Sequence, residues 1–252
     1  MKKLLYYFLF LPIVLCAQSN KSDTLRVKTS LSVTGFYQSG NVDALIFRVN
    51  STLRLKLVEN WVFKTKNSYV YQEFGKNKAD EDILSLNFLY FNPDQKIYPL
   101  LLGFVSTNFR REIALRSLFG AGVMYQVLNH DKYWLKLAIS SEYEQTRFRR
   151  DAFNRSAYDG NQAINTLRGT IWINGNYHLF KKKIILKHEL YFQPSLEQSN
   201  NFRWQADVSI ELPIWTFLSF QINYLQMFES IVIKNQKQED RFLTFGLSLK
   251  NY

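Results

Sequence analysis

Apolar and polar side chains alternate with a period of two residues along most of the chain from residue 25 onward. This alternation is typical of β-strands that have one apolar and one polar face. In the first such segment Leu31, Val33 and Tyr37 share one face, while Ser30 and Ser32 lie on the other. The pattern recurs and predicts twelve strands. They fall at residues 25–38, 45–57, 61–72, 83–92, 97–107, 114–128, 133–147, 165–180, 184–195, 202–212, 217–229 and 241–251.

The connections between the predicted strands alternate in length. Those after the even-numbered strands have three or four residues, whereas several of those after odd-numbered strands are longer. In outer-membrane barrels, short periplasmic turns alternate with longer external loops in this way. We therefore expect an all-β protein, a closed antiparallel transmembrane β-barrel with both termini in the periplasm. The longer connections are expected at residues 75–82, 148–164 and 231–240.

The direction of the apolar face is a separate question, because a soluble barrel turns its apolar face inward. Many predicted strands exceed the usual length of about five or six residues and match the roughly 9 to 11 that cross a bilayer. Aromatic residues of the apolar face gather near the strand ends, as they do where lipid meets water. We therefore expect Leu53, Ile171 and Ile210 to face lipid, and Asn50 and Ser209 to face the lumen. A secreted soluble β-protein is the alternative. The aromatic residues are Trp61, Tyr98, Tyr133 and Tyr177 near the turns, and Tyr37, Tyr71, Tyr143, Phe192, Trp204 and Phe228 near the loops.

Residues 1–17 differ in kind from the rest of the chain. Two lysines precede an apolar run that ends at Cys16, and Ala17 supplies a small residue before a polar segment. This is the layout of a secretory signal peptide, and the run is shorter than the roughly 17 to 25 residues of a spanning helix. We expect residues 18–252 to form the mature barrel; an uncleaved anchor is the alternative. Cleavage lowers the net charge from +11 to +9 and removes the single cysteine, so that no disulfide can form.

Two short stretches resemble a known family. They are SLSVTGFYQSGNVD at residues 30–43 and RSLFGAGVMY at residues 116–125. Both are similar to the salt-induced outer membrane protein family, which is built on a domain of unknown function. The resemblance extends in strand layout over nearly the whole mature chain, and it implies a bacterial outer-membrane barrel without an assigned activity. Independently of this resemblance, Gly120 and Gly122 are interpreted as glycines that allow close packing within a strand.

The last predicted strand resembles an assembly signal. Residues 244–249 read TFGLSL, although the terminal Tyr252 falls off the parity of Leu247 and Leu249. The expected partners are therefore the barrel-assembly machinery during biogenesis, and then outer-membrane lipid and lipopolysaccharide.

Residues that could support catalysis or metal binding are few. No Cys/His spacing resembles a metal site, and neither a nucleophile elbow nor a phosphate-binding loop occurs. Some outer-membrane barrels hydrolyse lipids from the lipid-facing wall, where parity places His188, but Ser141 of matching parity lies two strands away. We therefore expect no enzymatic activity, no cofactor and no metal. Asp80, Glu81 and Asp82 could bind calcium, but solvated loop charge is the favoured interpretation.

The polar face separates charge by sign. Strands one to three carry seven cations and no acid. The facing strands seven to ten carry five acids beside four cations, Lys136, Arg168, Lys187 and Arg203. Seven cations on adjacent strands repel if dry, so we expect water or a bound anion beside them. The lumen basic cluster consists of Arg26, Lys28, Arg48, Arg54, Lys56, Lys64 and Lys66. The opposing lumen acids are Glu142, Glu144, Glu189, Asp207 and Glu211.

These charges lead to two predicted functions. The first is a narrow passive pore for small anionic solutes in the bacterial cell outer membrane. The alternative is a non-conducting structural barrel for envelope integrity or stress tolerance, with its charges paired internally. A receptor or adhesin would need more elaborate loops, and export argues against nucleic-acid binding by this basic chain. In the longest loop, four arginines suit lipopolysaccharide phosphates: Arg147, Arg149, Arg150 and Arg155.

Overall fold

A computed structural model describes residues 26–39 and 43–250 of the chain. The expected signal peptide, the turn at Gly40 and Asn41, and Tyr252 lie outside the described residues. Among the described residues, no helix has the length and the hydropathy needed to cross a membrane.

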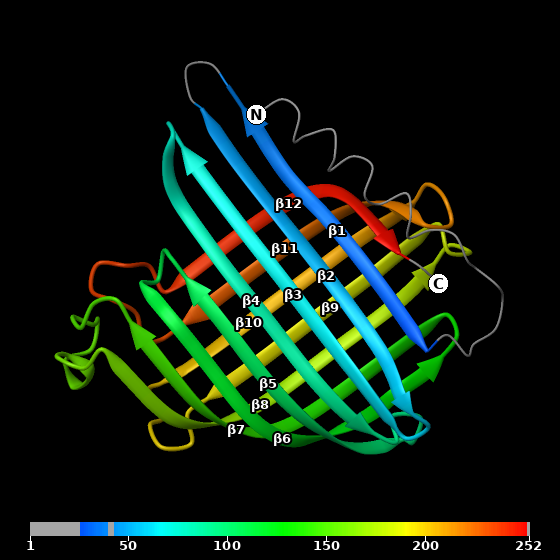
Figure 1. Cartoon of the computed structure of the whole chain (residues 1–252), viewed down its shortest axis with the longest axis horizontal. Helices are drawn as coiled ribbons and strands as arrows, with labels where there is room; N and C mark the ends of the chain where they lie inside the picture. Colours follow the sequence, from blue (N-terminus) through cyan, green and yellow to red (C-terminus); the bar gives the residue numbers. More distant parts are fainter. Residues whose placement is uncertain (1–25, 40–42, 251–252) are drawn as a thin grey trace.

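Twelve antiparallel strands form a closed barrel in which each strand is bonded to its neighbours in the chain and β1 is bonded to β12 (Figure 1). The predicted fold class is therefore confirmed, as are twelve strands. The strands are β1 Val27–Gln38, β2 Ala44–Val58, β3 Trp61–Phe74, β4 Asn77–Phe91, β5 Ile97–Asn108, β6 Ile113–His130, β7 Tyr133–Phe148, β8 Ala163–Leu179, β9 Ile184–Pro194, β10 Phe202–Pro213, β11 Leu218–Glu229 and β12 Glu239–Lys250.

The two ends of the barrel differ. The brief connections, such as Glu59 to Asn60, lie at the end where β1 begins and β12 ends, and we call it the turn end. The longer connections lie at the other end, which we call the loop end. They include residues 149–162, with the short 3-10 helix η2 (Ser156–Tyr158), and residues 230–238.

Burial alternates along the strands as the sequence predicts. On β7, Glu142 and Glu144 are each only 1% exposed, whereas Ile139 and Tyr143 between and beside them are 62% and 55% exposed. The outer wall is thus apolar and the inner wall largely polar, which suits a barrel surrounded by lipid. Tyr98 is an exception to the predicted outer aromatic belt. It is 2% exposed and points inward, because Ile97 and Leu101 occupy the alternate positions of β5 that face outward.

The connection between β3 and β4 is shorter than predicted. Residues 75–82 do not form a loop: Gly75 and Lys76 make a two-residue turn with φ of 55° and 66°, and β4 starts at Asn77. Positive φ at both positions is the geometry of a tight hairpin whose twist matches its strands. The paired strands therefore continue beyond the position where the sequence predicts their end.

Glycine permits close contact between neighbouring strands at β6 and β7. A Cβ atom on Gly120 would lie 2.2 Å from the backbone oxygen of Ser141, and one on Gly122 would lie 2.4 Å from that of Ile139. Any larger residue would force these strands apart. The two glycines of the RSLFGAGVMY stretch therefore have a packing role.

The ring closes between the first and last strands. Residues 30–34 of β1 pair with residues 246–250 of β12, whereas β1 pairs with β2 over its whole length. A Cβ on Gly246 would lie 2.3 Å from the backbone oxygen of Val33. This close approach makes glycine necessary in the closing pair of strands.

The outward parity leads to a stability prediction. Ile171 lies at the middle of β8 and is 47% exposed, so we expect Ile171→Arg to lower the free energy of unfolding by about 2–4 kcal/mol in a bilayer. Urea titration of the barrel in lipid vesicles measures this loss. The control is Asn50→Arg, on the inner wall and half-buried. Ser209 also faces inward, but it is a poorer control, because it is 7% exposed and leaves little room for an arginine side chain. Equal losses for Ile171→Arg and Asn50→Arg would contradict the assignment of the faces.

Candidate functional site: the barrel lumen

Five members of the lumen basic cluster lie near the turn end. The Cα atoms of Lys28 and Arg54 are partners across β1 and β2, and those of Arg54 and Lys64 are partners across β2 and β3. Arg26 and Lys56 are exposed beside them, and Lys28, Arg54 and Lys64 are half-buried. In the described part of the chain, none of the five has a carboxylate oxygen within 4.0 Å of its charged nitrogens. This group, which we call the turn-end cations, is therefore an uncompensated patch of positive charge.

Lys66 is the sixth member and has a partner across the lumen. Its ammonium forms an ion pair with Glu189 of β9, half a ring away from β3. The same nitrogen lies 5.4 Å from the ring centroid of Trp172 on β8. Side chains of opposite walls therefore meet in the middle of the barrel, and the lumen is narrow at this level.

Arg48, the seventh member, takes part in a separate relay. It is 4% exposed and donates a hydrogen bond of 3.1 Å to Oδ1 of Asn223 on β11. The Asn223 amide nitrogen in turn donates to Asp207 on β10 at 2.5 Å. Arg48 also lies over the ring of Phe242, 5.5 Å from its centroid. The seven cations thus divide into three groups: five turn-end cations, Lys66 in an ion pair across the lumen, and Arg48 in a chain of hydrogen bonds.

Arginines gather around Glu144 near the loop end. Its carboxylate is 2.5 Å from Nε of Arg168, 2.7 Å from a terminal nitrogen of Arg203 and 3.6 Å from Nε of Arg116. Arg116 also donates two parallel hydrogen bonds of 2.8 Å to Glu229. Because β6 and β11 are almost half a ring apart, this bidentate pair crosses the lumen as well.

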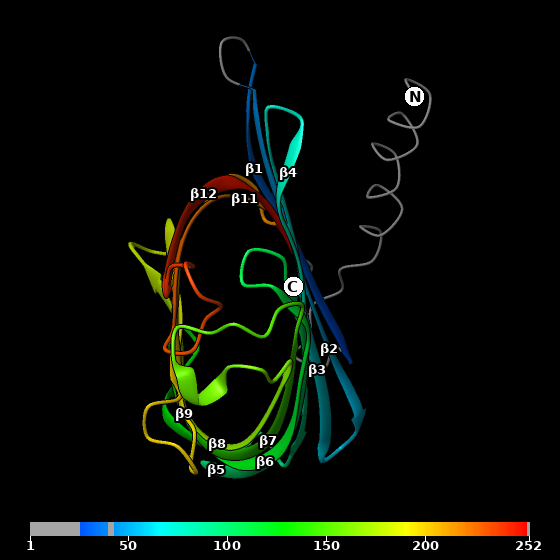
Figure 2. The same cartoon turned by 90° about the vertical axis from the view of Figure 1, so that its left-hand side faces the viewer.

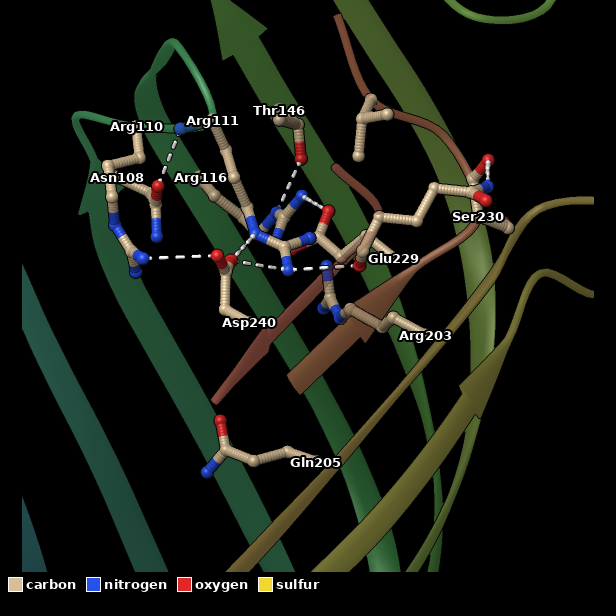
Figure 3. Close-up of polar contacts among 12 residues, drawn as sticks. Asn108, Arg110, Arg111, Arg116, Thr146, Arg203, Gln205, Glu229, Ser230 and Asp240 are labelled. Atoms are coloured by element: carbon tan, nitrogen blue, oxygen red, sulfur yellow. Dashed lines mark hydrogen bonds and ion pairs between the residues drawn. The ribbon is translucent and has the colours of Figure 1, made fainter. Parts of the chain in front are cut away.

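A second group of ion pairs continues this network toward the loops, as Figure 3 shows. Arg111 donates to Asp240 at 2.8 Å, and Arg110 lies 3.0 Å from the other oxygen of the same carboxylate. Sequence reasoning missed Arg110, Arg111, Arg116, Glu229 and Asp240. A signal existed for Arg116, which has inward parity on β6, but the two arginines of the β5–β6 loop belong to no periodic pattern.

Asp80 lies in a strand, and not in a loop as the sequence predicts. It is on β4, is 0% exposed, and its carboxylate is 2.6 Å from Nε of Arg110. Asp82 accepts hydrogen bonds from the backbone nitrogen of Phe109 and the side chain of Asn108, and Glu81 pairs with a lysine of the hairpin. Asp80 and Asp82 are thus held by protein partners within the barrel and are not solvated loop charge, whereas Glu81 is partly exposed on the same strand. In the described residues, no group of three His, Cys, Asp or Glu side chains is placed to hold a metal.

The remaining opposing lumen acids also face inward. Glu211 is 1% exposed and forms an ion pair with Lys187 of the neighbouring strand β9. Glu142 accepts hydrogen bonds from the hydroxyls of Ser140 and Thr170, the latter at 2.7 Å. In the described part of the chain no cationic nitrogen lies within 4.0 Å of Glu142. It is therefore a buried carboxyl held only by hydroxyl groups.

An apolar cluster that the alternation of residues does not predict fills one side of the lumen. Phe88 of β4 and Trp172 of β8 stack with centroids 5.0 Å apart and planes at 7°. β5 is apolar on both faces over most of its length, and the inward residues of β4 are apolar from Leu84 to Tyr90, a pattern that could have revealed the cluster. The other members are Val62, Tyr90, Tyr98, Leu100, Met124 and Ala138.

A partly open cavity lies beside this cluster, and we call it the mid-lumen cavity. Its walls are mostly leucine and aromatic side chains of β4, β5, β6, β8 and β9. The charged and amide or hydroxyl-bearing aliphatic residues in its lining are Glu142, Ser140, Thr170, Glu189 and Gln193, and Tyr191 and Trp172 add a phenol and an indole.

Small polar residues line the opposite side of the lumen. They come from β1 and from β10 to β12, and all are buried. Their side chains make this wall polar. They are Ser32, Thr34, Ser209, Ser219, Gln221, Asn223, Thr244 and Ser248.

Two loops cover the loop end. Phe153 of the β7–β8 loop pairs with Ile233 of the β11–β12 loop, flanked by backbone hydrogen bonds of 2.9 and 2.8 Å. Both residues pack with Ile113, Phe148 and Tyr158 in a buried apolar group. Figure 2 shows the β7–β8 loop lying across the barrel opening.

The arginines considered for lipopolysaccharide binding are scattered over this end. Arg147 is exposed at the end of β7, and Arg155 is exposed just before η2. Arg150 is 3.2 Å from Glu112, and Arg149 lies 5.5 Å from the ring centroid of Phe109. Their lipid contacts stay a prediction.

His188 lies on the outer wall beside an aromatic partner. Its Nε2 is 3.2 Å from the Tyr177 hydroxyl, and the two rings stack with centroids 5.6 Å apart. Ser141 is on β7, separated from β9 by β8. The structure therefore brings His188 to a tyrosine and does not bring it to Ser141.

Comparison with known proteins gives a family and a fold. Residues 31–250 match the family model described as a protein of unknown function, DUF481. No curated protein matches the sequence. The NanC porin is 11% identical with a TM-score of 0.55, and the match covers 88% of this chain and 100% of that one. This likeness shows an outer-membrane barrel fold.

Two further structures have TM-scores below 0.5. The KdgM porin has a TM-score of 0.43 at 6% identity, over 90% of this chain and 99% of that one. The translocator domain of the autotransporter NalP from Neisseria meningitidis has a TM-score of 0.42 at 10% identity, over 98% of this chain and 95% of that one.

Proposed function

This chain belongs to the DUF481 family of proteins of unknown function, and we propose that it is a narrow channel for small anionic solutes in the bacterial outer membrane. The turn-end cations carry the proposal. They lie side by side on three neighbouring strands, face the lumen and have no carboxylate partner in the described part of the chain. A patch of this kind concentrates anions at the mouth of a channel.

The route proposed for solutes follows the small polar residues of β1 and β10 to β12. The apolar cluster occupies the other side, and the Lys66–Glu189 pair bounds the route at its middle. Anion preference is then set at the turn end, since the middle of the lumen carries acids as well as Lys66. We expect the turn end to be periplasmic, as in other barrels with short turns on that side.

Charge reversal of the turn-end cations tests this function. We expect Arg54→Glu, Lys56→Glu and Lys64→Glu together to shift the selectivity of the channel from anions toward cations. The shift should weaken as added salt screens the charges. Reversal potentials in planar bilayers under a salt gradient measure it. Lys66 is left unchanged, because its ion pair with Glu189 would be lost along with the charge.

The matched control has the same change in charge at the same end of the barrel. Lys181→Glu, Lys182→Glu and Lys183→Glu lie in the exposed β8–β9 turn, outside the lumen. Selectivity that shifts equally in both triple variants would point to overall charge and contradict a role for the lumen patch. Conductance with unchanged ion preference would show that the route avoids the patch.

A structural barrel is the second candidate function, and the bridges across the lumen favour it. Lys66 with Glu189, and Arg116 with Glu229, join nearly opposite walls and hold the barrel from within. Such a barrel would contribute to envelope integrity without conducting. Absence of conductance in both triple variants and in the parent, where a control porin conducts, would select it.

A further inference from the structure

We propose that the mid-lumen cavity binds a small amphipathic cation, an organic ammonium on an aliphatic or aromatic body, through the carboxylate of Glu142. The cavity is a partly open hollow inside the barrel, with the mostly apolar lining that is common in small-molecule sites. Its lining joins a large apolar wall to a few polar groups. This inference is independent of anion passage, because binding is measured without any flow of solute.

The first support is the state of Glu142. This carboxyl group lines the cavity, is 1% exposed and accepts hydrogen bonds only from Ser140 and Thr170 in the described part of the chain. The arginines nearby are held by Glu144, at 2.5 Å from Arg168 and 2.7 Å from Arg203. A buried carboxylate without a cation is costly, so a ligand that brings a positive charge gains a strong partner there.

The second support is an ammonium group that the protein itself places at the same cavity. The Lys66 side chain lies against Glu189 and 5.4 Å from the centroid of the Trp172 ring, and both partners line the cavity. A carboxylate together with an indole face is a recurring receptor for ammonium ions. The cavity therefore has two acids, of which one holds an internal ammonium and the other holds none.

The third support is the chemistry of the remaining wall. Leu86, Leu100, Leu102, Phe104 and Leu118 surround the space, and the stacked Phe88 adds an aromatic face. Such a wall favours a hydrocarbon or aromatic body over a strongly hydrated ion such as an amino acid or sugar phosphate. The combination with one free acid selects a molecule with a single positive charge and an apolar remainder.

The test uses 2-phenylethylammonium as the probe, with the purified full-length mature barrel in detergent and isothermal titration calorimetry as the measurement. We expect saturable binding of this probe, and much weaker binding of 3-phenylpropanoate and 2-phenylethanol, which have the same ring without the positive charge. Equal binding of the three compounds would overturn the role of the charge.

Two variants locate the site. Glu142→Gln should weaken binding at least tenfold. Glu239→Gln should leave binding unchanged, because Glu239 is a half-buried acid of β12 that does not line the cavity. Ala138→Leu keeps Glu142 but fills part of the cavity, and should also weaken binding. Folding of each variant is checked by its heat-dependent mobility in gel electrophoresis. Folded Glu142→Gln protein that binds the probe as well as the parent does would overturn the proposal, and so would undiminished binding by folded Ala138→Leu protein.

Discussion

Replacement of Glu144 by glutamine should lower the free energy of unfolding by about 3–5 kcal/mol, the range found when one partner of a buried ion pair is removed. Glu144 is 1% exposed, and its carboxylate is shared by Arg116, Arg168 and Arg203. The amide of glutamine carries no charge, so three guanidinium groups would be left close together inside the barrel. Urea titration in lipid vesicles, followed by tryptophan fluorescence, measures the loss.

The control for this prediction is Glu239→Gln. Glu239 also pairs with an arginine, Arg241, at 2.8 Å, but both side chains are on the surface. Exposed pairs contribute little to stability, so the loss should be much smaller there. Arg203→Gln added to the Glu144→Gln variant should recover part of the stability, because it removes one of the unpaired cations. Equal stability of the Glu144→Gln variant and the parent would show that water, and not the carboxylate, solvates these arginines.

The second large effect expected is a several-fold rise in single-channel conductance when Lys66 and Glu189 are both replaced by alanine. The two side chains reach toward each other from opposite walls, and their ion pair lies across the middle of the lumen, where we propose that solutes pass. Removal of both avoids leaving one buried charge without a partner. Planar bilayer recordings measure the change.

Lys78→Ala with Glu81→Ala is the matched control, because this pair is 2.8 Å apart and exposed on the β3–β4 hairpin. Its conductance should equal that of the parent. A Lys66→Ala, Glu189→Ala variant that is folded and conducts no better than the parent would show that the bridge does not limit the route. The structural barrel would then be favoured if neither protein conducts at all.

The strands and their faces could be predicted from the sequence because a barrel wall separates lipid from lumen at each residue. Where one face is apolar and the other polar, as at Glu142 and Tyr143, parity alone is sufficient. On β5 both faces are apolar over most of the strand, so alternation cannot tell them apart there. Tyr98 was therefore placed outside, and the apolar cluster of the lumen was missed.

Partners across the lumen could not be predicted, since they depend on which strands face each other and on how far apart the walls lie. Lys66 and Glu189 are separated by 123 residues, and Arg116 and Glu229 by 113. Alternation along the strands places Lys66 and Glu189 in the interior, but it does not show that the two side chains pair with each other. Asp80 was misread for a different reason: acidic residues after a glycine suggested a loop, while the strand continues through them.

The pairing of β1 with β12 has a consequence for how the ring is completed during synthesis. These strands are the first and the last to be made, so the barrel cannot close until nearly the whole chain is available. Before that moment β1 and the growing C-terminal strand are both open sheet edges, and each can recruit a foreign strand. Contacts of such large sequence separation are also slow to form. Pairing of residues 30–34 with residues 246–250 is thus the step that closes the sheet into a ring. It removes both open edges, and with them the risk of aggregation through those edges.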